Sequence, residues 1–359
     1  MTGGGVYPAL AVLQAMKSKS SSVLWIGSEG KMEQEILADQ VLNVTSIPAA
    51  GLHGVGFFDI PGNLIKLTRG YFKARQLIQE FQPDVIFFTG GFLGVPVSLA
   101  SGKTPSVVFI PDIEPGAAIN YLIRRAKVIT MATEETFRFL PTHKKSIVTG
   151  YPIRSEITQW TRGKGFKALK LSSKLPVLLV FGGSKGALSI NQALYPILPE
   201  LLKMTQLVHL SGIDNCAEAE IVKANLPREF SQHYHVFPFL HKKMGAALAS
   251  ANLVVCRAGA STLGELPFFG LPAILVPYPH AWQYQRTNAE YLVKKGGAMI
   301  LENHDLTSQL LPRVTNLLKD VKTLGQMQNC MSKLARPDAA INIGEILNKV
   351  GTMKGEPSL

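Results

Sequence analysis

The sequence lacks the long apolar segment that a membrane-spanning helix requires. Although 46% of its 359 residues are hydrophobic and only 17% are charged, no uncharged apolar run reaches about 18 residues. Its start, MTGGGVYPAL, also lacks the basic segment followed by an apolar stretch that marks a secretory signal. We therefore expect a cytoplasmic protein without a transmembrane helix.

Cysteine is scarce as well. Cys216, Cys256 and Cys330 lie far apart, and their spacing fits neither a disulfide framework nor a metal or redox motif. We interpret them as buried free thiols in a reducing compartment, and we expect no metal site.

Acidic residues are too few to balance the basic ones. The chain has 37 Lys and Arg against 25 Asp and Glu, which gives a formal net charge of +12. Such a charge predicts an anionic partner: nucleic acid, anionic lipid or a phosphorylated substrate. Because no RNA-binding aromatic signature, zinc finger or long basic tract is present, we expect no nucleic-acid partner. A phospholipid surface and a phosphorylated substrate remain.

The sequence does contain short runs rich in Val, Ile and Leu that alternate with longer segments of helical period. This pattern is typical of doubly wound α/β domains, in which helices cover both faces of a parallel sheet. The length of the chain suggests two such domains. The expected strands are Val23–Ile26, Val85–Thr89, Ser106–Ile110, Val128–Met131, Val177–Phe181, Leu207–Leu210, Leu253–Cys256 and Ala273–Val276.

A glycine-rich turn opens a helix once in each half of the chain. The first is at Gly3, Gly4 and Gly5, and the second runs from Gly182 to Gly186. Each half thus begins like a nucleotide-binding α/β unit. Neither turn fits the dinucleotide fingerprint or the P-loop spacing, so NAD and ATP receive little support.

The turn-forming stretch Thr149–Pro152 separates the two halves. We place an N-terminal domain at residues 1–152, a C-terminal domain at 153–340 and a terminal helix or tail at 341–359. Only Met1 precedes Thr2 and Gly3, where the first glycine turn begins, so we expect the first strand of the N-terminal sheet to be missing from this chain.

The segment Val177–Ala187 predicts a strand, a Gly-Gly-Ser-Lys-Gly turn and a helix start. Glycines let a phosphate approach the backbone, Ser184 supplies a hydroxyl, and a helix N-terminus contributes N–H groups and a positive dipole. The segment suits a phosphate site, although a plain strand-to-helix turn has the same pattern.

Two polar loops follow the expected strands at 253–256 and 273–276. Arg257–Glu265 reads as a small-residue turn that enters a short helix, and Pro277–Asn288 as a loop that enters another. Open α/β sheets bind ligands where neighbouring strands end, so both loops are candidates for ligand contact. The Glu265 carboxylate could accept hydrogen bonds from two ribose hydroxyls. A solvated helix charge is the alternative.

Residues 57–75 interleave apolar and basic side chains. A helix of this kind suits an anionic lipid surface, but an amphipathic helix packed on its own sheet has the same period. Both interpretations stay open. The apolar positions are Phe57, Phe58, Ile60, Leu64, Ile65, Leu67, Tyr71 and Phe72, and the basic ones are Lys66, Arg69, Lys73 and Arg75.

These motifs, taken in order, resemble the donor-site signatures of the MurG family of GT-B glycosyltransferases. The resemblance implies a GT-B fold, in which two Rossmann-like doubly wound α/β domains face a cleft. It also implies inverting transfer of N-acetylglucosamine from UDP-GlcNAc to an undecaprenyl-pyrophosphoryl-muramoyl peptide, a lipid-linked acceptor of peptidoglycan synthesis. The segments that carry it are Thr2–Leu10, Gly90–Pro96, Val148–Arg154, Gly182–Ala187, Arg257–Glu265, Gly270–Ala273 and His280–Ala289.

Carried over residue by residue, the resemblance assigns Ser184 and its glycines to the donor pyrophosphate and Glu265 to the ribose. UDP-GlcNAc is then the donor substrate, and no cofactor is implied; the sequence also has no Asp-x-Asp. The implied donor-binding residues are Arg154, Gly183, Ser184, Gly186, Arg257, Gly259, Ala260, Glu265, His280 and Gln285. The implied acceptor-binding residues are Gly3, Gly4, Gly5, Gly90 and Gly91.

The sequence departs from the family at three places. Tyr284 stands where the family often has Gln or His near the sugar. Gly5 replaces the histidine of a Thr-Gly-Gly-His turn, and Ile110–Ile113 replaces a His-Glu-Gln-Asn segment on the acceptor side. Two alternatives follow: a related UDP-sugar transferase that builds another glycolipid, and a UDP-sugar-binding subunit without catalysis of its own.

Inversion needs a base near the attacking hydroxyl and positive or dipolar groups that stabilise the leaving UDP. Asp112 and Glu114 follow an expected strand end in a Pro-flanked loop, and we favour Asp112 over Glu114. Carboxylates that cap the next helix would show the same pattern, and His53 and His280 are further candidates. Together with the basic charge, the lipid-linked acceptor predicts a peripheral protein on the inner face of the cell membrane.

Overall fold

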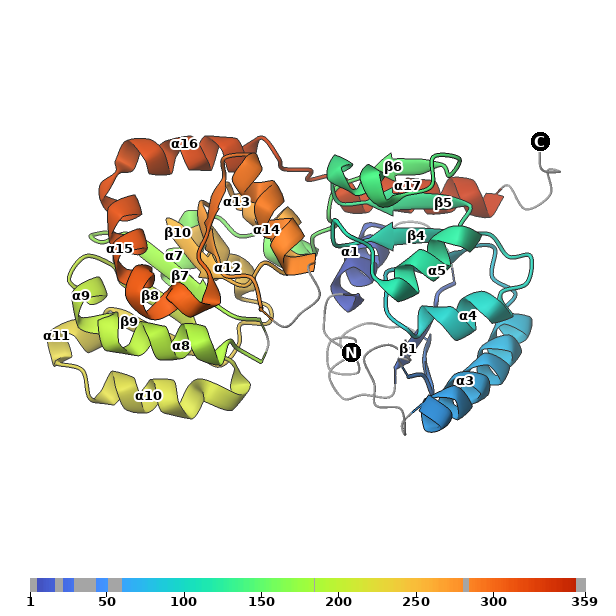
Figure 1. The fold of residues 1–359 in the computed structure, drawn as a ribbon, viewed down its shortest axis with the longest axis horizontal. Coiled ribbons are helices and arrows are strands. Elements are labelled where there is room, and N and C mark those ends of the chain that lie inside the picture. The colour runs from blue at the N-terminus through green and yellow to red at the C-terminus, as the bar shows by residue number, and fades with distance from the viewer. Residues whose placement is uncertain are drawn as a thin grey trace. The chain divides into compact units, whose positions relative to one another are not determined.

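The computed structural model describes residues 5–16, 22–28, 43–50, 60–183, 185–279 and 284–352. The chain divides into two compact units, one formed by Met1–Arg154 with Asp338–Leu359 and the other by Ser155–Pro337 (Figure 1). The division therefore falls after Arg154 rather than after residue 152. The C-terminal helix α17 (Ala339–Thr352) belongs to the first unit, where it packs on α1 (Val6–Met16), and is not a separate tail.

The first unit contains two parallel sheets. One pairs β1 (Leu24–Ser28) with β2 (Asn43–Ile47). The other has the order β3-β4-β5-β6, with β3 at Ile86–Phe88, β4 at Ser106–Ile110, β5 at Val128–Met131 and β6 at Ser146–Val148. All five residues of β4 are buried, which suits its Ser-Val-Val-Phe-Ile sequence, because β-branched and aromatic side chains favour strands. The expectation of a missing first strand concerns residues 1–4, which lie outside the described ranges.

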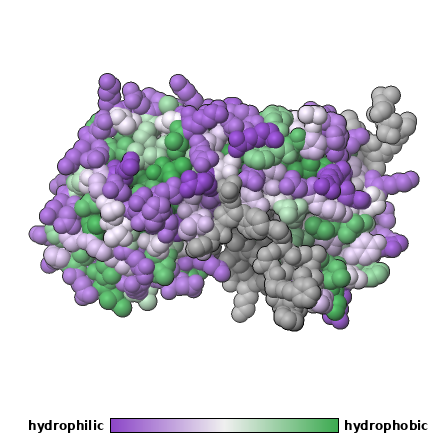
Figure 2. All heavy atoms as spheres, viewed as in Figure 1, coloured by the Kyte–Doolittle hydropathy of each residue, from purple (hydrophilic) through white to green (hydrophobic). Residues whose placement is uncertain are grey.

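Helices and short 3-10 turns connect these strands. The α-helices are α3 (Ile60–Phe81), α4 (Gly94–Ala100) and α5 (Ala117–Arg125), and η2 (Glu134–Phe139) is a 3-10 helix. Figure 2 shows hydrophobic residues interspersed with hydrophilic ones over the region of α3 and α4. Within the ranges given above, no helix is both long and apolar enough to cross a bilayer.

The second unit is built on one parallel six-stranded sheet of order β12-β11-β10-β7-β8-β9. The chain enters the sheet at β7, adds β8 and β9 on one side, and then continues from β10 on the other side. The sheet therefore has a topological switch point between β7 and β10, where open α/β sheets bind ligands. The strands are β7 (Val177–Phe181), β8 (Gln206–Leu210), β9 (Tyr234–Phe237), β10 (Leu253–Cys256), β11 (Ala273–Leu275) and β12 (Ala298–Ile300).

Helices cover both faces of this sheet. They are α6 (Ser155–Thr158), α7 (Arg162–Leu169), α8 (Leu188–Leu194), α9 (Leu198–Leu202), α10 (Cys216–Ala224), α11 (Arg228–Ser231), α12 (Met244–Ser250), α13 (Thr262–Phe269), α14 (Tyr284–Lys294), α15 (Leu306–Lys319) and α16 (Val321–Ser332). The short 3-10 helices are η3 (Tyr195–Ile197), η4 (Ile213–Asn215) and η5 (Asn303–Asp305).

Candidate functional site

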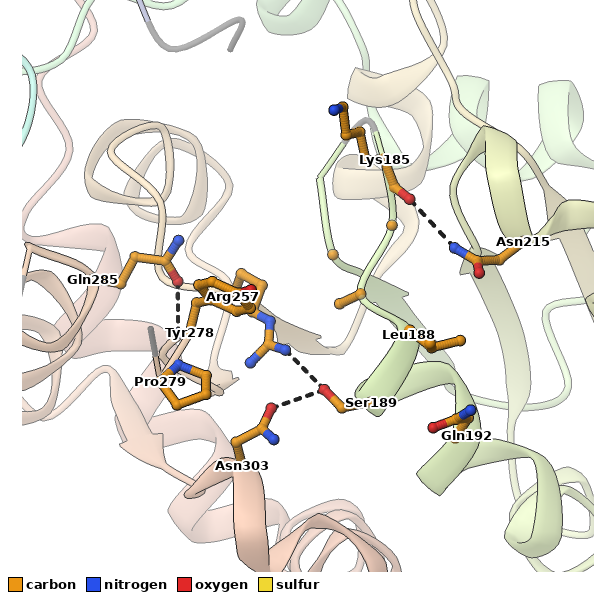
Figure 3. Close-up of a pocket in the computed structure, with 13 residues that line it drawn as sticks. Lys185, Leu188, Ser189, Gln192, Asn215, Arg257, Tyr278, Pro279, Gln285 and Asn303 are labelled. Atoms are coloured by element: carbon orange, nitrogen blue, oxygen red, sulfur yellow. Dashed lines mark hydrogen bonds between the residues drawn. The ribbon is translucent and has the colours of Figure 1, made fainter. Parts of the chain in front are cut away.

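A pocket of about 530 Å³ opens in the second unit (Figure 3). Its wall includes the glycine-rich turn after β7 and Arg257 directly after β10, so it lies at the switch point of the sheet. Three residues of the expected donor set line it, namely Gly186, Arg257 and Gln285.

The glycine-rich turn after β7 requires glycine at two of its positions. Gly183 and Gly186 have φ angles of +95° and +79°, which side chains rarely adopt. A Cβ on Gly186 would collide with the carbonyl oxygen of Ser211, whereas a Cβ on Gly183 would meet open space. The backbone at Gly183 is therefore open to a ligand, while Gly186 is packed against the loop after β8.

Arg257 joins three elements of the pocket wall. Its Nη1 donates to the carbonyl oxygens of Val276 and Pro277 at 3.1 and 3.3 Å, and its Nη2 donates to Ser189 Oγ at 2.8 Å. The Ser189 hydroxyl in turn donates to Asn303 Oδ1 at 2.8 Å. Burial lowers the pKa of Arg257, but a guanidinium stays charged in proteins. The pocket wall therefore carries a fixed positive charge.

The first turn of α14 is hydrogen-bonded to Tyr278 and to Glu302. The backbone N–H of Tyr278 donates to Gln285 Oε1 at 2.9 Å. Next to Gln285, Arg286 Nη2 donates to both carboxylate oxygens of Glu302 at 2.7 and 2.8 Å. Since Glu302 precedes Asn303, these bonds and those of Arg257 link residues 276–278, the first turn of α14, residues 302–303 and the first turn of α8.

Gly259 and Ala260 lie between β10 and α13, and Glu265 lies on α13; none of the three lines the pocket. Glu265 is half-buried in the first turn of α13, and a Cβ on Gly259 would meet nothing within 4 Å. Thr262 Oγ1 donates to the Gly259 carbonyl at 2.6 Å and fixes this segment. Burial, followed by the negative charge of Glu265, raises the pKa of the buried Cys256 thiol, so that thiol is not a nucleophile.

Four predicted site residues fall outside the described ranges: Gly3, Gly4, Ser184 and His280. His53, the further candidate base, also lies there. Within the part of the chain that the structure describes, no three His, Cys, Asp or Glu side chains are grouped as a metal site requires.

The structure brings the described acceptor-side glycines together in the first unit. Thr89 Oγ1 donates to the carbonyl oxygen of Gly5 at 2.7 Å, which ties the start of α1 to the loop after β3. Gly90 and Gly91 follow Thr89 with φ angles of +125° and +80°. Side chains rarely adopt such φ angles, so this loop requires glycine at both positions.

Asp112 and Glu114 lie in the loop between β4 and α5, and both are half-buried. Helix α5 has Gly116 as its N-cap and no acidic residue in its first turn. Neither carboxylate thus occupies a capping position of that helix. Arg154, an expected donor residue, places its guanidinium 3.9 Å from the centre of the Tyr7 ring within the first unit.

Sequence reasoning missed several polar residues of the pocket wall. Ser189, Asn303, Asn215 and Lys185 all line it. Asn303 and Asn215 lie in the loops that follow β12 and β8, and polar residues in loops after strands were a usable signal. No sequence motif indicated that Ser189 lines the pocket, because its hydrogen bond with Arg257 depends on the order of strands in the sheet.

Comparison with known proteins identifies two family regions in the chain. Residues 2–127 match the glycosyltransferase family 28 N-terminal domain, and residues 177–343 match the glycosyltransferase family 28 C-terminal domain.

Relatives of known name align over nearly their whole length. Two proteins named UDP-N-acetylglucosamine--N-acetylmuramyl-(pentapeptide) pyrophosphoryl-undecaprenol N-acetylglucosamine transferase are each 34% identical to this chain. The one from Roseiflexus sp. (strain RS-1) aligns over 96% of this chain and 92% of its own length. The one from Halothermothrix orenii aligns over 94% and 93%.

A solved structure also matches both units. The crystal structure of Acinetobacter baumannii MurG is 25% identical, with a TM-score of 0.74 over 97% of this chain and 96% of that one. The predicted GT-B fold class is thereby confirmed.

Proposed function

The chain belongs to glycosyltransferase family 28, and from that premise we propose that it transfers N-acetylglucosamine from UDP-GlcNAc to a lipid-linked N-acetylmuramyl-peptide acceptor in peptidoglycan precursor synthesis. The observation that carries the proposal is the pocket at the switch point of the second unit, with its glycine-rich turn and its fixed guanidinium. The relatives that share the whole chain are named for this transfer.

The pocket suits the pyrophosphate of a UDP-sugar. Lys185 and Arg257 place their charges around one cavity, and the same turn has open backbone at Gly183. An anion gains most from charge held in a partly desolvated site. As the sugar departs, UDP acquires negative charge, which these groups stabilise. In this proposal Glu265 binds the ribose and Gln285 contacts the donor, and the donor substrate is the one small molecule required.

The acceptor side is proposed for the first unit. A hydroxyl of the acceptor attacks the anomeric carbon of the donor sugar, the bond to UDP breaks, and the configuration inverts. Asp112 is the proposed base that takes the proton of this hydroxyl, with Glu114 as the second candidate. Gly5, Gly90 and Gly91, which meet at one end of β3, form the proposed acceptor loop.

A peripheral position on the inner face of an anionic membrane is part of the proposal, and the side chains exposed on α3 support the membrane contact. Leu64, Ile65 and Phe72 are 56%, 55% and 62% exposed, so these apolar side chains are not covered by the sheet. Four basic residues lie exposed on the same helix: Lys66, Arg69, Lys73 and Arg75. Exposed apolar residues flanked by basic ones favour insertion into an anionic interface.

Two substitutions test the residue roles. With radiolabelled UDP-GlcNAc and a lipid-linked acceptor, Asp112→Asn is expected to lower kcat by at least about 100-fold, the scale of general-base catalysis, while UDP binding stays unchanged. Glu265→Gln is expected to weaken UDP binding. Full turnover in Asp112→Asn, with Glu114→Asn reduced instead, would move the base to Glu114. If the wild type binds UDP but transfers sugar to no lipid acceptor, the protein is a UDP-sugar-binding subunit without catalysis of its own.

A further inference from the structure

Buried polar side chains of the second unit form a row of hydrogen bonds outside the pocket lining. His209 on β8 is fully buried; its Nδ1 lies 2.8 Å from Tyr234 Oη and its Nε2 lies 3.0 Å from Asn191 Oδ1. Asn191 Nδ2 donates to the carbonyl oxygen of Ser211 at 2.9 Å. These hydrogen bonds thus connect β9, β8 and α8 with the loop after β8.

The last bond of the row fixes the direction of all the others. Asn191 must present its amide N–H to a carbonyl, so its oxygen faces His209 and can only accept. The Nε2 of His209 therefore carries the proton, and Nδ1 accepts from the Tyr234 hydroxyl. Burial lowers the pKa of His209 to about 3, so the imidazole remains neutral at physiological pH.

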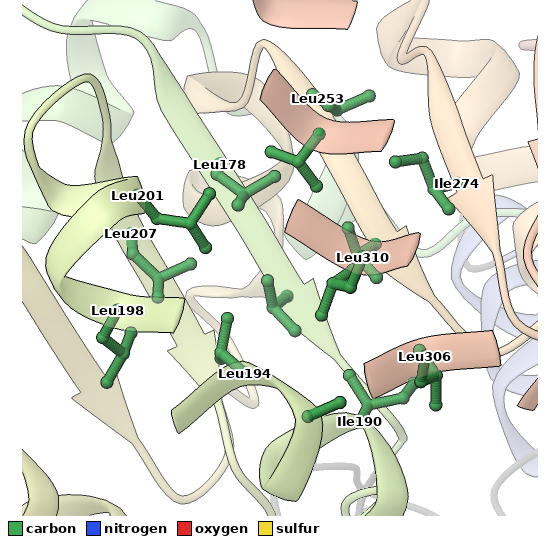
Figure 4. Packing of buried hydrophobic residues seen from close by; sticks show 14 of the residues in the cluster. Leu178, Ile190, Leu194, Leu198, Leu201, Leu207, Leu253, Ile274, Leu306 and Leu310 are labelled. Carbon is green, nitrogen blue, oxygen red and sulfur yellow. The ribbon is translucent and has the colours of Figure 1, made fainter. Parts of the chain in front are cut away.

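Asn191 is itself held in place by its neighbours. It lies on α8 near Ile190 and Leu194, which are fully buried and belong to the same hydrophobic cluster as Leu178 and Leu207 of the sheet (Figure 4). The amide is thus anchored by the hydrophobic core, with its orientation set by His209.

The loop after β8 packs against the glycine-rich turn. A Cβ on Gly186 would collide with the Ser211 carbonyl, and one on Gly212 would collide with the carbonyl oxygen of Lys185. Asn215 Nδ2 also donates to the Lys185 carbonyl at 3.3 Å. The two loops therefore meet backbone to backbone, and a displacement of Ser211 displaces Gly186.

We propose that His209 and Asn191 are positioning residues for the donor pyrophosphate site, which they serve by holding the Ser211 carbonyl against which the glycine-rich turn packs. The inference rests on the proposed function and deepens it. Neither residue lines the pocket, so both act through the turn and not on the substrate.

A matched pair of substitutions at His209 tests the proposal. In His209→Gln the amide nitrogen can still donate to Asn191, whereas His209→Met offers similar bulk without a donor. With UDP as the probe in calorimetry, the Met variant is expected to bind about tenfold more weakly, the effect of about one hydrogen bond, and the Gln variant within about threefold of wild type. In transfer assays the donor KM should rise in the Met variant, while the acceptor KM stays unchanged.

A control separates positioning from general stability. Thr205→Val removes a buried hydroxyl that donates to the Leu201 carbonyl at 2.9 Å in the same unit, and neither residue lines the pocket. It should lower the melting temperature without changing UDP affinity. Equal UDP affinity in wild type and both His209 variants would overturn the inference and leave the proposed function standing. Failure of the wild type to bind UDP would overturn both.

The tautomer gives a second readout. Nitrogen NMR of histidine-labelled protein should show His209 protonated at Nε2 and bare at Nδ1, with the signal identified by its loss in the Gln variant. Protonation at Nδ1 instead would contradict the chain of bonds described here.

Discussion

The guanidinium of Arg257 lies 2.8 Å from the hydroxyl of Ser189 and joins the end of β10 to the first turn of α8. Three of its hydrogen bonds go to protein groups, at Val276, Pro277 and Ser189. Arg257 is therefore held rigidly, and its charge is set in place before a ligand arrives. Preorganised charge of this kind stabilises a leaving group without reorganisation during the reaction.

The first prediction concerns the guanidinium of Arg257 and its hydrogen bonds. A lysine keeps the charge but cannot reach Val276, Pro277 and Ser189 together. Arg257→Lys is expected to weaken UDP binding by about 2 kcal/mol, or roughly 30-fold, as measured by calorimetry. Arg162→Lys is the matched control, because Arg162 also bonds to protein oxygens, at Ser250 and Asn252, but does not line the pocket. Equal losses of affinity in the two variants would contradict a special role for Arg257.

The second prediction concerns the glycine-rich turn. Gly186→Ala places a Cβ against the Ser211 carbonyl at a φ of +79°, so the turn must shift, and transfer activity should fall by at least about tenfold. Gly163→Ala in α7 is the control, since a Cβ there meets nothing within 4 Å. That change should keep activity and raise stability by up to about 1 kcal/mol. Unchanged donor kinetics in Gly186→Ala would show that the turn does not bind the donor.

The third prediction concerns pH. The pKa of His209 is lowered to about 3 by burial, so between pH 6.5 and 3 the unfolded chain binds a proton that the folded chain does not. The stability that His209 contributes is therefore complete above about pH 6.5 and is lost as the pH falls through this window. Its packed neighbours are the Tyr234 hydroxyl, the Asn191 amide and the ring of Tyr195, and none of these titrates there.

Urea unfolding of wild type and His209→Gln at pH 7 and pH 5 measures this effect. Between the two pH values the wild type should lose about 2 kcal/mol more unfolding free energy than the variant. An identical pH dependence in the two proteins would mean that His209 is not a buried neutral imidazole.

The fourth prediction concerns the membrane. Leu64→Ser with Phe72→Ser removes two apolar side chains from the exposed face of α3 and should lower binding to phosphatidylglycerol vesicles at least about tenfold in a sedimentation assay. Ile221→Ser on α10 is the control, because Ile221 is equally exposed, at 64%, but lies in the second unit. If both variants bind vesicles as the wild type does, α3 is not a lipid-binding helix.

Much of the fold could be predicted because strands and glycine turns leave local signals. The expected strands at Ser106–Ile110, Val128–Met131, Val177–Phe181 and Leu253–Cys256 match β4, β5, β7 and β10. The chain length and the two glycine turns also indicated two domains. The position of α17 in the first unit was missed, because a terminal helix carries no local signal for the unit on which it packs.

The pocket was predicted only in part, for a similar reason. Gly186, Arg257 and Gln285 stood in motifs that could be read along the chain, and all three line the pocket. Ser189 follows β7 and Asn303 follows β12, so they come together through the strand order β12-β11-β10-β7, which is a property of topology. His209 belongs to no motif in the sequence, and its polar partners come from α8 and β9.

The most direct test of the central claim is mass spectrometry of the product formed from an equimolar mixture of UDP-GlcNAc, UDP-GalNAc and UDP-glucose with a lipid-linked muramyl-peptide acceptor. Isotopic labelling of the GlcNAc alone distinguishes it from its epimer. The account predicts a product that carries one labelled N-acetylglucosamine per acceptor. A product that carries glucose or unlabelled N-acetylgalactosamine, or an acceptor left unmodified while UDP still binds, would contradict it.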